Sequence, residues 1–294
     1  MDFRFLYDET RDLFSIGYLV EEARLDLGCY DLLASEARLT SFVTIAKREV
    51  PAAHWFRLGR ALVPVDGGAA LVSWSGSMFE YLMPSLLMDT PHGSLLETTL
   101  RRVIVRHINF GRERNIPWGI SESAYNVRDI HLTYQYSNFG VPGLGLKRGL
   151  GKDTVVAPYA TALAAMYDAK SAVLNFERLT EAGGLGRYGF YEALDFTASR
   201  LPKAKDVAIV RAHMAHHQGM TLVALANATL GGEIRHRFHR IPMVQATELL
   251  LQETAQRDVT LAPPRSDRAT PAIASSTAGP LDRRVNSPHA VLPS

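Results

Sequence analysis

The spacing of apolar residues predicts a mainly helical chain. In most segments Leu, Val, Ile, Phe and Met recur every three or four residues, which places them on one face of an α-helix. Ser94 followed by Glu97 is a capping-box pattern, and Pro158 suits the first turn of a helix. We therefore expect helices over residues 30–49, 94–108, 158–167, 192–200 and 206–230.

A strand pattern occurs in residues 61–74, where two short apolar runs flank the hairpin-turn sequence Asp66-Gly67-Gly68. The string Gly184–Gly189 matches the dinucleotide-binding fingerprint letter by letter. That fingerprint requires a preceding strand and a parallel βαβ unit, and the surrounding sequence predicts neither. We therefore expect a loop that approaches a ligand, or a plain glycine-rich connection, and no nucleotide site.

The composition changes after about Thr260. Six of the 15 prolines lie between Pro263 and Pro293, among Ser, Thr, Ala and Arg. Such a segment buries too little apolar area to offset the entropy lost on ordering. We expect a folded domain over residues 1–260 and a disordered tail over residues 261–294.

Composition and charge exclude several classes of protein. The 294 residues are 47% hydrophobic and 21% charged, as in globular proteins, and the net charge of +2 does not indicate binding to nucleic acid. No apolar run reaches 18 residues, so we expect no membrane span. The single Cys29 excludes an intrachain disulfide. The N-terminus lacks a secretory signal pattern and enters a folded-looking segment at once, so we expect more chain upstream.

Three histidines, His213, His216 and His217, have the spacing to share one face of a helix. Such a face can bind zinc, contact a polar ligand or simply pack. The sequence has no HExxH string, and no acidic residue lies within that turn. We therefore predict no metal and no cofactor.

Glu36 and Glu122 each follow a serine and lie among apolar or aromatic residues. Breaking a glycosidic bond requires two carboxyl groups in different surroundings, because one donates a proton while the other attacks the sugar or activates water. The alternative is that Glu36 is an ordinary carboxylate on a helix surface and that Glu122 caps a helix. Glu192 is a third acidic candidate, which could instead lie in the first turn of its own helix.

Seven motifs in one order resemble a known family. The chain resembles the glucoamylase-like middle region of bacterial cyclic β-1,2-glucan synthases, which is related to endo-β-1,2-glucanases. The resemblance runs from about Met1 to Pro264. The motifs lie at residues 3–8, 13–18, 30–39, 54–60, 73–84, 118–122 and 215–220.

The resemblance implies an all-α glycosidase-like domain, an (α/α)6 barrel, with a small β-hairpin. We count fewer helices than such a barrel contains, so the barrel is expected to be incomplete at its N-terminus. It also implies retaining transglycosylation, which closes β-1,2-glucan chains into rings, with Glu36 as nucleophile and Glu122 as acid/base. An inverting endo-β-1,2-glucanase and a non-catalytic glucan-binding fragment are the alternatives.

Several further residues are expected to contact sugar, although each could equally belong to the core. Aromatic rings suit the apolar faces of sugars, and polar side chains suit their hydroxyl groups. The candidates are Arg57, Trp74, Glu80, Tyr81, Trp118, Tyr125, Tyr188, His216 and His217. By resemblance, the partners are a β-1,2-glucan and the glycosyltransferase and phosphorylase regions of a synthase. The expected location is the cytoplasm, at the inner membrane through those regions.

Overall fold

The computed structural model describes residues 1–254, and the expected tail over residues 261–294 lies outside them. The α-helices are α1 (Arg38–Ala46), α2 (Ala53–Arg57), α3 (Met78–Leu82), α4 (Leu95–Glu113), α5 (Pro158–Ala165), α6 (Ala169–Glu181), α7 (Ala215–Thr229), α8 (Glu233–His239) and α9 (Pro242–Gln245). Short 3-10 helices are η1 (Arg4–Leu6), η2 (Met83–Leu86), η3 (Ala198–Arg200) and η4 (Glu248–Gln252).

The strands form small antiparallel sheets between the helices. The N-terminal sheet has the order β1-β2-β5, and a second sheet has the order β10-β13-β14. The other strands pair as the hairpins β3–β4, β6–β7, β8–β9 and β11–β12. Their bounds are β1 (Tyr7–Asp8), β2 (Leu13–Ser15), β3 (Tyr18–Leu19), β4 (Arg24–Leu25), β5 (Cys29–Tyr30), β6 (Leu62–Val65), β7 (Gly68–Leu71), β8 (Ser123–Arg128), β9 (Tyr134–Ser137), β10 (Val155–Val156), β11 (Leu185–Gly186), β12 (Gly189–Phe190), β13 (Ala193–Asp195) and β14 (Ala208–Val210).

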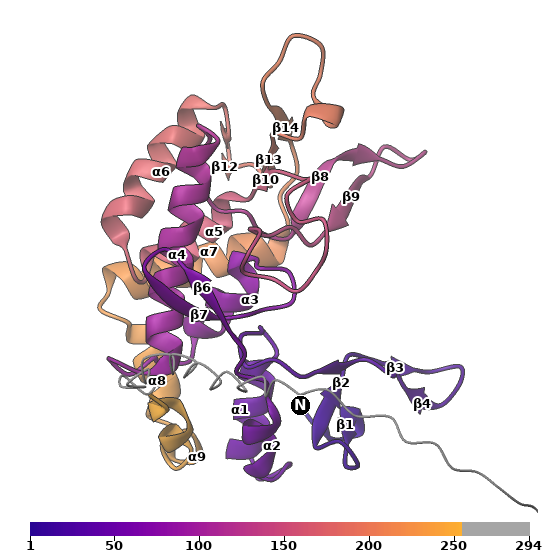
Figure 1. Ribbon diagram of the computed structural model, residues 1–294, viewed down its shortest axis with the longest axis vertical. Coiled ribbons are helices and arrows are strands. Elements are labelled where there is room, and N and C mark those ends of the chain that lie inside the picture. Colours follow the sequence, from indigo (N-terminus) through magenta and orange to yellow (C-terminus); the bar gives the residue numbers. More distant parts are fainter. Residues whose placement is uncertain (255–294) are drawn as a thin grey trace, which may run out of the picture. The chain divides into compact units, whose positions relative to one another are not determined.

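Helix α5 lies at the centre of the helical packing. Every residue from Pro158 to Ala165 is buried, and the helix packs against α3, α6 and α7 (Figure 1). Small alanine side chains on α5 let these neighbours approach closely. The predicted first-turn position of Pro158 is confirmed.

Helix α4 and the β6–β7 hairpin confirm two local predictions. The Ser94 hydroxyl accepts a hydrogen bond from the Glu97 amide at 3.1 Å, which caps the helix as its sequence predicts. The hairpin turns at Asp66-Gly67, and its strands pack against α4. Gly67 has a φ of 79°, a conformation that glycine adopts without strain.

Three expected helices are wrong in part. The helix expected over residues 30–49 begins only at Arg38, because Tyr30 pairs with β2, Leu32 forms a bridge with Gly59, and bends and turns follow up to Ala37. The helix expected over 192–200 is strand β13 followed by η3, and the one expected over 206–230 is strand β14 followed by α7. In each case pairing with a strand distant in sequence outcompeted local helix propensity.

The expected all-α class with one hairpin is therefore too simple, since small sheets occur throughout residues 1–254. The helices described there form no closed barrel. None of them has the length and apolar composition that crossing a bilayer requires.

Candidate active site

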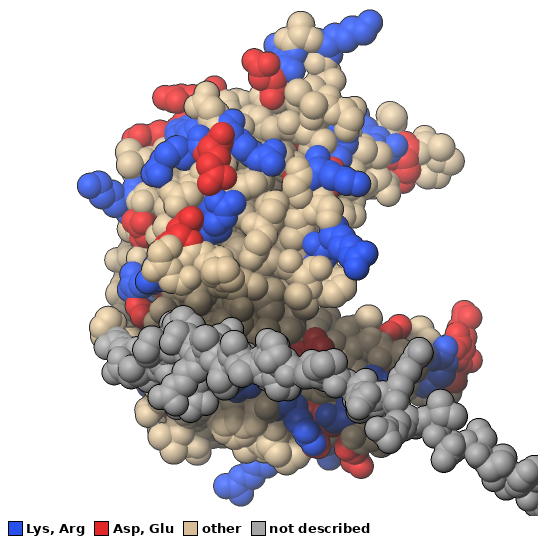
Figure 2. Space-filling model, in the orientation of Figure 1, with Lys and Arg blue, Asp and Glu red and all other residues tan. Residues whose placement is uncertain are grey.

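A cavity of about 510 Å³ brings together Glu36 and Glu122, which are far apart in the sequence. Figure 2 shows the molecule hollowed between the part that carries β8 and β9 and the part that carries β3 and β4. The residues lining the cavity are Ile16, Gly28, Cys29, Tyr30, Asp31, Leu32, Ser35, Glu36, Trp74, Glu80, Glu122 and Asn138.

Glu36 lies in the turn just before α1, outside a helix, although the sequence predicted a helix over residues 30–49. Its side chain is half-buried and accepts a hydrogen bond from the Ser35 hydroxyl at 3.1 Å. The same hydroxyl accepts from the Ala37 amide at 3.2 Å, which fixes the shape of the turn. Local backbone geometry therefore positions Glu36.

Arg38 ties this turn to α3. Its guanidinium is buried and donates to the backbone carbonyls of Ser35 at 3.1 Å, Glu80 at 3.2 Å and Tyr81 at 2.5 Å. Burial lowers the pKa of Arg38 to about 10, so the group remains cationic at neutral pH. Because the guanidinium joins one carbonyl of this turn to two carbonyls of α3, Arg38 acts chiefly as a structural clamp.

Glu80 organises the loop that carries Trp74. One carboxylate oxygen accepts from the Ser73 hydroxyl at 2.6 Å and the other from the Ser75 amide at 2.9 Å. Glu80 also completes a capping box with Ser77 at the start of α3. Burial raises the pKa of Glu80, and the hydrogen bonds from Ser73 and Ser75 oppose that effect. These contacts give Glu80 a structural role, and its contact with sugar remains a prediction.

Trp74 is 57% exposed and lines the cavity, so its ring is available to a ligand. The segment around Gly140 packs tightly against this loop. A Cβ atom added to Gly140 would lie 1.8 Å from the Ser75 carbonyl oxygen, so no other residue fits without displacing the backbone. The position of Trp74 is thus set by close backbone packing.

Glu122 directly precedes β8, and the register of β8 with β9 brings Tyr136 beside it. Tyr136 pairs with Ala124, so Tyr136 and Glu122 lie diagonally on one face of the hairpin. The Tyr136 hydroxyl is 2.7 Å from Glu122 Oε1. The backbone carbonyl of Glu122 accepts from the Tyr159 hydroxyl at 2.9 Å, which anchors the residue to α5.

The surroundings of Glu122 favour its protonated form. Burial is the main cause that raises its pKa, and the carboxylates of Glu36 and Glu80 raise it further. The hydrogen bond from Tyr136 acts in the opposite direction, because it stabilises the ionised carboxylate. A carboxyl group with a raised pKa beside a second carboxyl group is suited to general acid catalysis.

His217 and Glu192 lie behind Tyr136. His217 Nδ1 is 2.8 Å from Glu192 Oε1, and its Nε2 is 3.4 Å from the Tyr136 hydroxyl. The imidazole stacks on the Tyr159 ring with 3.8 Å between centroids. Because His217 is only 1% exposed, it does not present an atom to the cavity as predicted for a sugar contact.

Tyr81 and Trp118 are buried, contrary to the expectation that they present rings to sugar. The Tyr81 hydroxyl donates to the carbonyls of Leu71 and Leu144, which holds the side chain in the core. The Trp118 backbone exchanges hydrogen bonds with the Asn175 amide, and its side chain packs beneath α4 at Gly111. Both residues support the site from within the core.

Four other predicted contacts lie outside the cavity lining. Tyr125 stacks edge-on against Phe139, and Arg57 faces Asp12 at 3.4 Å. Tyr188 is at the tip of the β11–β12 hairpin, exposed to solvent. His216 is exposed beside Tyr136, at the start of α7.

Four residues at or beside the site were not among the predicted ones: Tyr136, Tyr159, Tyr30 and Asn138. Tyr134-Gln135-Tyr136 alternates aromatic and polar residues, which is the pattern of a half-buried strand and could have revealed β9. Nothing local connects Tyr136 with Glu122, because only strand pairing brings them together.

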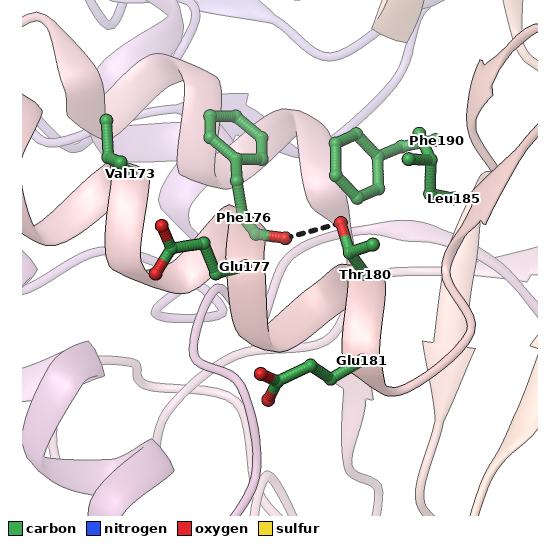
Figure 3. Close-up of a pocket in the computed structure, with 7 residues that line it drawn as sticks. All are labelled: Val173, Phe176, Glu177, Thr180, Glu181, Leu185 and Phe190. Atoms are coloured by element: carbon green, nitrogen blue, oxygen red, sulfur yellow. Dashed lines mark hydrogen bonds between the residues drawn. The ribbon is translucent and has the colours of Figure 1, made fainter.

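A second hollow of about 530 Å³ lies on α6 and the β11–β12 hairpin, and neither Glu36 nor Glu122 lines it. Figure 3 shows Phe176 and Phe190 side by side there, with their ring centroids 5.2 Å apart. The Gly184–Gly189 string forms this hairpin, and no parallel βαβ unit occurs among residues 1–254. In the same part of the chain, no three His, Cys, Asp or Glu side chains gather in a metal-binding arrangement.

Comparison with known proteins agrees with the fold. The chain belongs to the family described as "Putative glucoamylase", whose model matches residues 29–242, and its fold is that of glucoamylase-like glycosidases. More particularly, it is 56% identical over 259 residues to the cyclic β-(1,2)-glucan synthase NdvB of Rhizobium meliloti. That alignment covers 88% of this chain and 9% of NdvB. The resemblance inferred from the seven motifs is confirmed.

Two solved structures share the fold at low sequence identity. A protein named "putative glucoamylase" from Bacteroides fragilis has a TM-score of 0.63 and 18% identity, over 87% of this chain and 62% of its own. An endo-β-1,2-glucanase from Chitinophaga pinensis, solved with sophorotriose and glucose, has a TM-score of 0.61 and 15% identity. The match covers 82% of this chain and 59% of the glucanase.

Proposed function

We propose that this chain acts on β-1,2-glucan, breaking one glycosidic bond and forming another, with Glu36 and Glu122 as the catalytic pair. The observation that carries the proposal is that both carboxyl groups line one cavity beside an exposed tryptophan. The names of the NdvB relative and of the glucanase supply the substrate class. Since NdvB is much longer than this chain, we also propose that this chain works beside glycosyltransferase and phosphorylase regions.

The two glutamates take different roles in this proposal. Glu122 donates its proton to the leaving glycosidic oxygen, and Glu36 attacks the anomeric carbon to form a glycosyl-enzyme. Glu122 then removes a proton from a hydroxyl group at the other end of the glucan. That oxygen displaces Glu36, so the configuration at the anomeric carbon is retained and a ring forms. The raised pKa of Glu122 supports its role as the acid.

Product masses test the reaction. Linear β-1,2-glucan is incubated with the chain, with Glu36→Gln and Glu122→Gln, and with Glu181→Gln, an exposed residue on α6, as the matched control. Rings are one water lighter than linear chains of equal length. We expect rings from the parent and the control, and a loss of at least about a thousandfold in both site variants.

Short linear products would overturn ring closure and favour the hydrolase. No turnover by a sample that circular dichroism shows to be folded would overturn catalysis by this chain alone.

The roles of nucleophile and acid are tested by adding azide to the alanine variants of the two glutamates. A glycosyl azide of inverted configuration should form only when the nucleophile is missing, so we expect it from Glu36→Ala. If Glu122→Ala forms this azide instead, Glu122 is the nucleophile and Glu36 the acid, and the two residues remain the catalytic pair.

A further inference from the structure

A separate pocket of about 200 Å³, which we call the basic pocket, adjoins the cavity that holds Glu36 and Glu122. The residues lining the basic pocket are Asn138, Phe139, Lys147, Arg148, Gly149, Leu150, Lys152 and Asp153. Asn138 also lines the cavity of the two glutamates, so the two hollows meet at this residue. The Lys147 amide donates to the carbonyl of Trp74 at 2.8 Å, which joins the basic pocket to the loop that carries the exposed ring.

The two hollows carry charges of opposite sign. Four carboxyl groups line the cavity of the two glutamates, and among the described residues no Lys, Arg or His lines it. Three cations and one carboxylate, that of Asp153, line the basic pocket. Asp153 is paired with Arg200, so its charge is already compensated. An anion is therefore repelled by the first hollow and attracted to the second.

The cations of the basic pocket have donors to spare. Lys147 Nζ donates to the backbone carbonyl of Asn138 at 2.9 Å and to its side-chain oxygen at 2.5 Å, which uses two of its three N–H groups. The stem of Lys152 lies across the turn at Gly149, since a Cβ atom added there would be 3.7 Å from Lys152 Cδ. Arg148 is exposed beside them and adds a guanidinium, which donates from a planar fork of N–H groups.

The backbone of the same turn adds further donors. Gly149 has a φ of 80°, and its carbonyl accepts from the Lys152 amide at 3.0 Å, which closes the turn. Within residues 1–254, the amides of Gly149 and Leu150 donate to no acceptor. Successive amides in such a turn form concavities that bind anions.

We propose that the basic pocket binds a phosphate group. Phosphate offers several acceptor oxygens to the unused N–H of Lys147, to the Arg148 guanidinium and to the Lys152 ammonium. A neutral sugar has donors as well as acceptors, and a site built mainly of cationic donors suits it less well. The phosphate is either the free inorganic ion or an ester on a sugar, whose ring would then lie toward Asn138. The proposal goes beyond the proposed function and does not rest on it.

Phosphate binding can be measured without any activity. Inorganic phosphate is titrated with the full chain at neutral pH and low salt, and the ³¹P signal reports the bound fraction. We expect a dissociation constant on the order of 1 mM, which two or three charge-assisted hydrogen bonds provide. Adding sodium chloride to about 0.5 M should weaken binding through screening.

The double variant Arg148→Gln/Lys152→Gln tests the assignment to this pocket. Both side chains are exposed, so the fold should be retained, and the dissociation constant should rise at least about tenfold. Arg187→Gln/Lys205→Gln is the matched control, because it removes the same charge from exposed positions outside the pocket. We expect the control to bind phosphate like the parent. Equal weakening in both double variants would show a general effect of net charge and would overturn the proposal.

Two further ligands decide what the basic pocket recognises. Glucose 1-phosphate should displace inorganic phosphate, and tighter binding of the ester would identify a sugar phosphate as the source, whereas equal or weaker binding would identify the free ion. Sophorose, a neutral β-1,2-linked disaccharide, should not displace phosphate. Displacement by sophorose, or no phosphate binding by the folded parent, would overturn the proposal and leave the proposed function standing. If the parent binds phosphate but turns over no glucan, the proposed function fails and this inference stands.

Discussion

Glu36 and Glu122 share a cavity but are positioned in different ways. Glu36 lies in a turn shaped by Ser35 and by the buried Arg38, which donates to three backbone carbonyls. Glu122 is held through its side chain by Tyr136, with His217 and Glu192 behind it. A residue held by the backbone depends on the fold, whereas a residue held by a side-chain network can be retuned without unfolding.

Arg38→Met should have the largest effect on stability, because it removes the hydrogen bonds that hold the turn carrying Glu36. The substitution removes three hydrogen bonds from the guanidinium to backbone carbonyls, at about 1 kcal/mol each, so the free energy of unfolding should fall by about 3 kcal/mol. Urea unfolding measures the change. Arg57→Met, at an exposed arginine, is the control and should change stability by less than about 1 kcal/mol. Equal effects at both positions would contradict the clamp assigned to Arg38.

Trp74→Ala tests ligand contact on the same side of the cavity. The ring is mostly exposed, so we expect little change in stability but a rise in KM of about tenfold through lost stacking on sugar. The pH profile should not move, because Trp74 carries no charge. Tyr188→Ala removes an aromatic ring outside the cavity lining and should leave KM unchanged. Steady-state kinetics on linear glucan separates these outcomes.

Tyr136→Phe tests the Glu122 side. The hydroxyl of Tyr136 lowers the pKa of Glu122, so its removal should raise that pKa further. The acid then keeps its proton to higher pH, and the alkaline limb of the rate profile should move upward by up to about one unit. A downward shift in Tyr136→Phe would contradict the role of this hydroxyl as a donor to the ionised Glu122 carboxylate.

Glu122→Gln should change the stability less than Arg38→Met does, and in the opposite direction. The pKa of Glu122 is raised in the folded state, so the unfolded state loses the proton first and stability falls as pH rises through that pKa. Glutamine does not titrate. The variant should therefore be more stable than the parent by about 1 kcal/mol above that pH, with the difference vanishing in acid. Urea unfolding across pH measures it, and a difference that persists in acid would point to another cause.

Local sequence signals were sufficient where the structure depends on neighbouring residues. The Ser94 cap, the first-turn Pro158 and the hairpin at Asp66-Gly67 needed only nearby atoms, and all three were predicted correctly. The helices expected over 30–49 and 192–200 are wrong in part, because Tyr30 and β13 pair with strands elsewhere in the chain. Helical spacing in a short segment does not reveal such pairing.

The sequence by itself determined the family and both glutamate motifs, because those depend on the order of residues along the chain. It also singled out Trp74, which lines the cavity. Only the tertiary structure decided that Tyr81 and Trp118 belong to the core, and that Tyr136 lies beside Glu122. The reason is physical: the burial of a side chain and its hydrogen-bond partners depend on segments packed against it from distant parts of the chain.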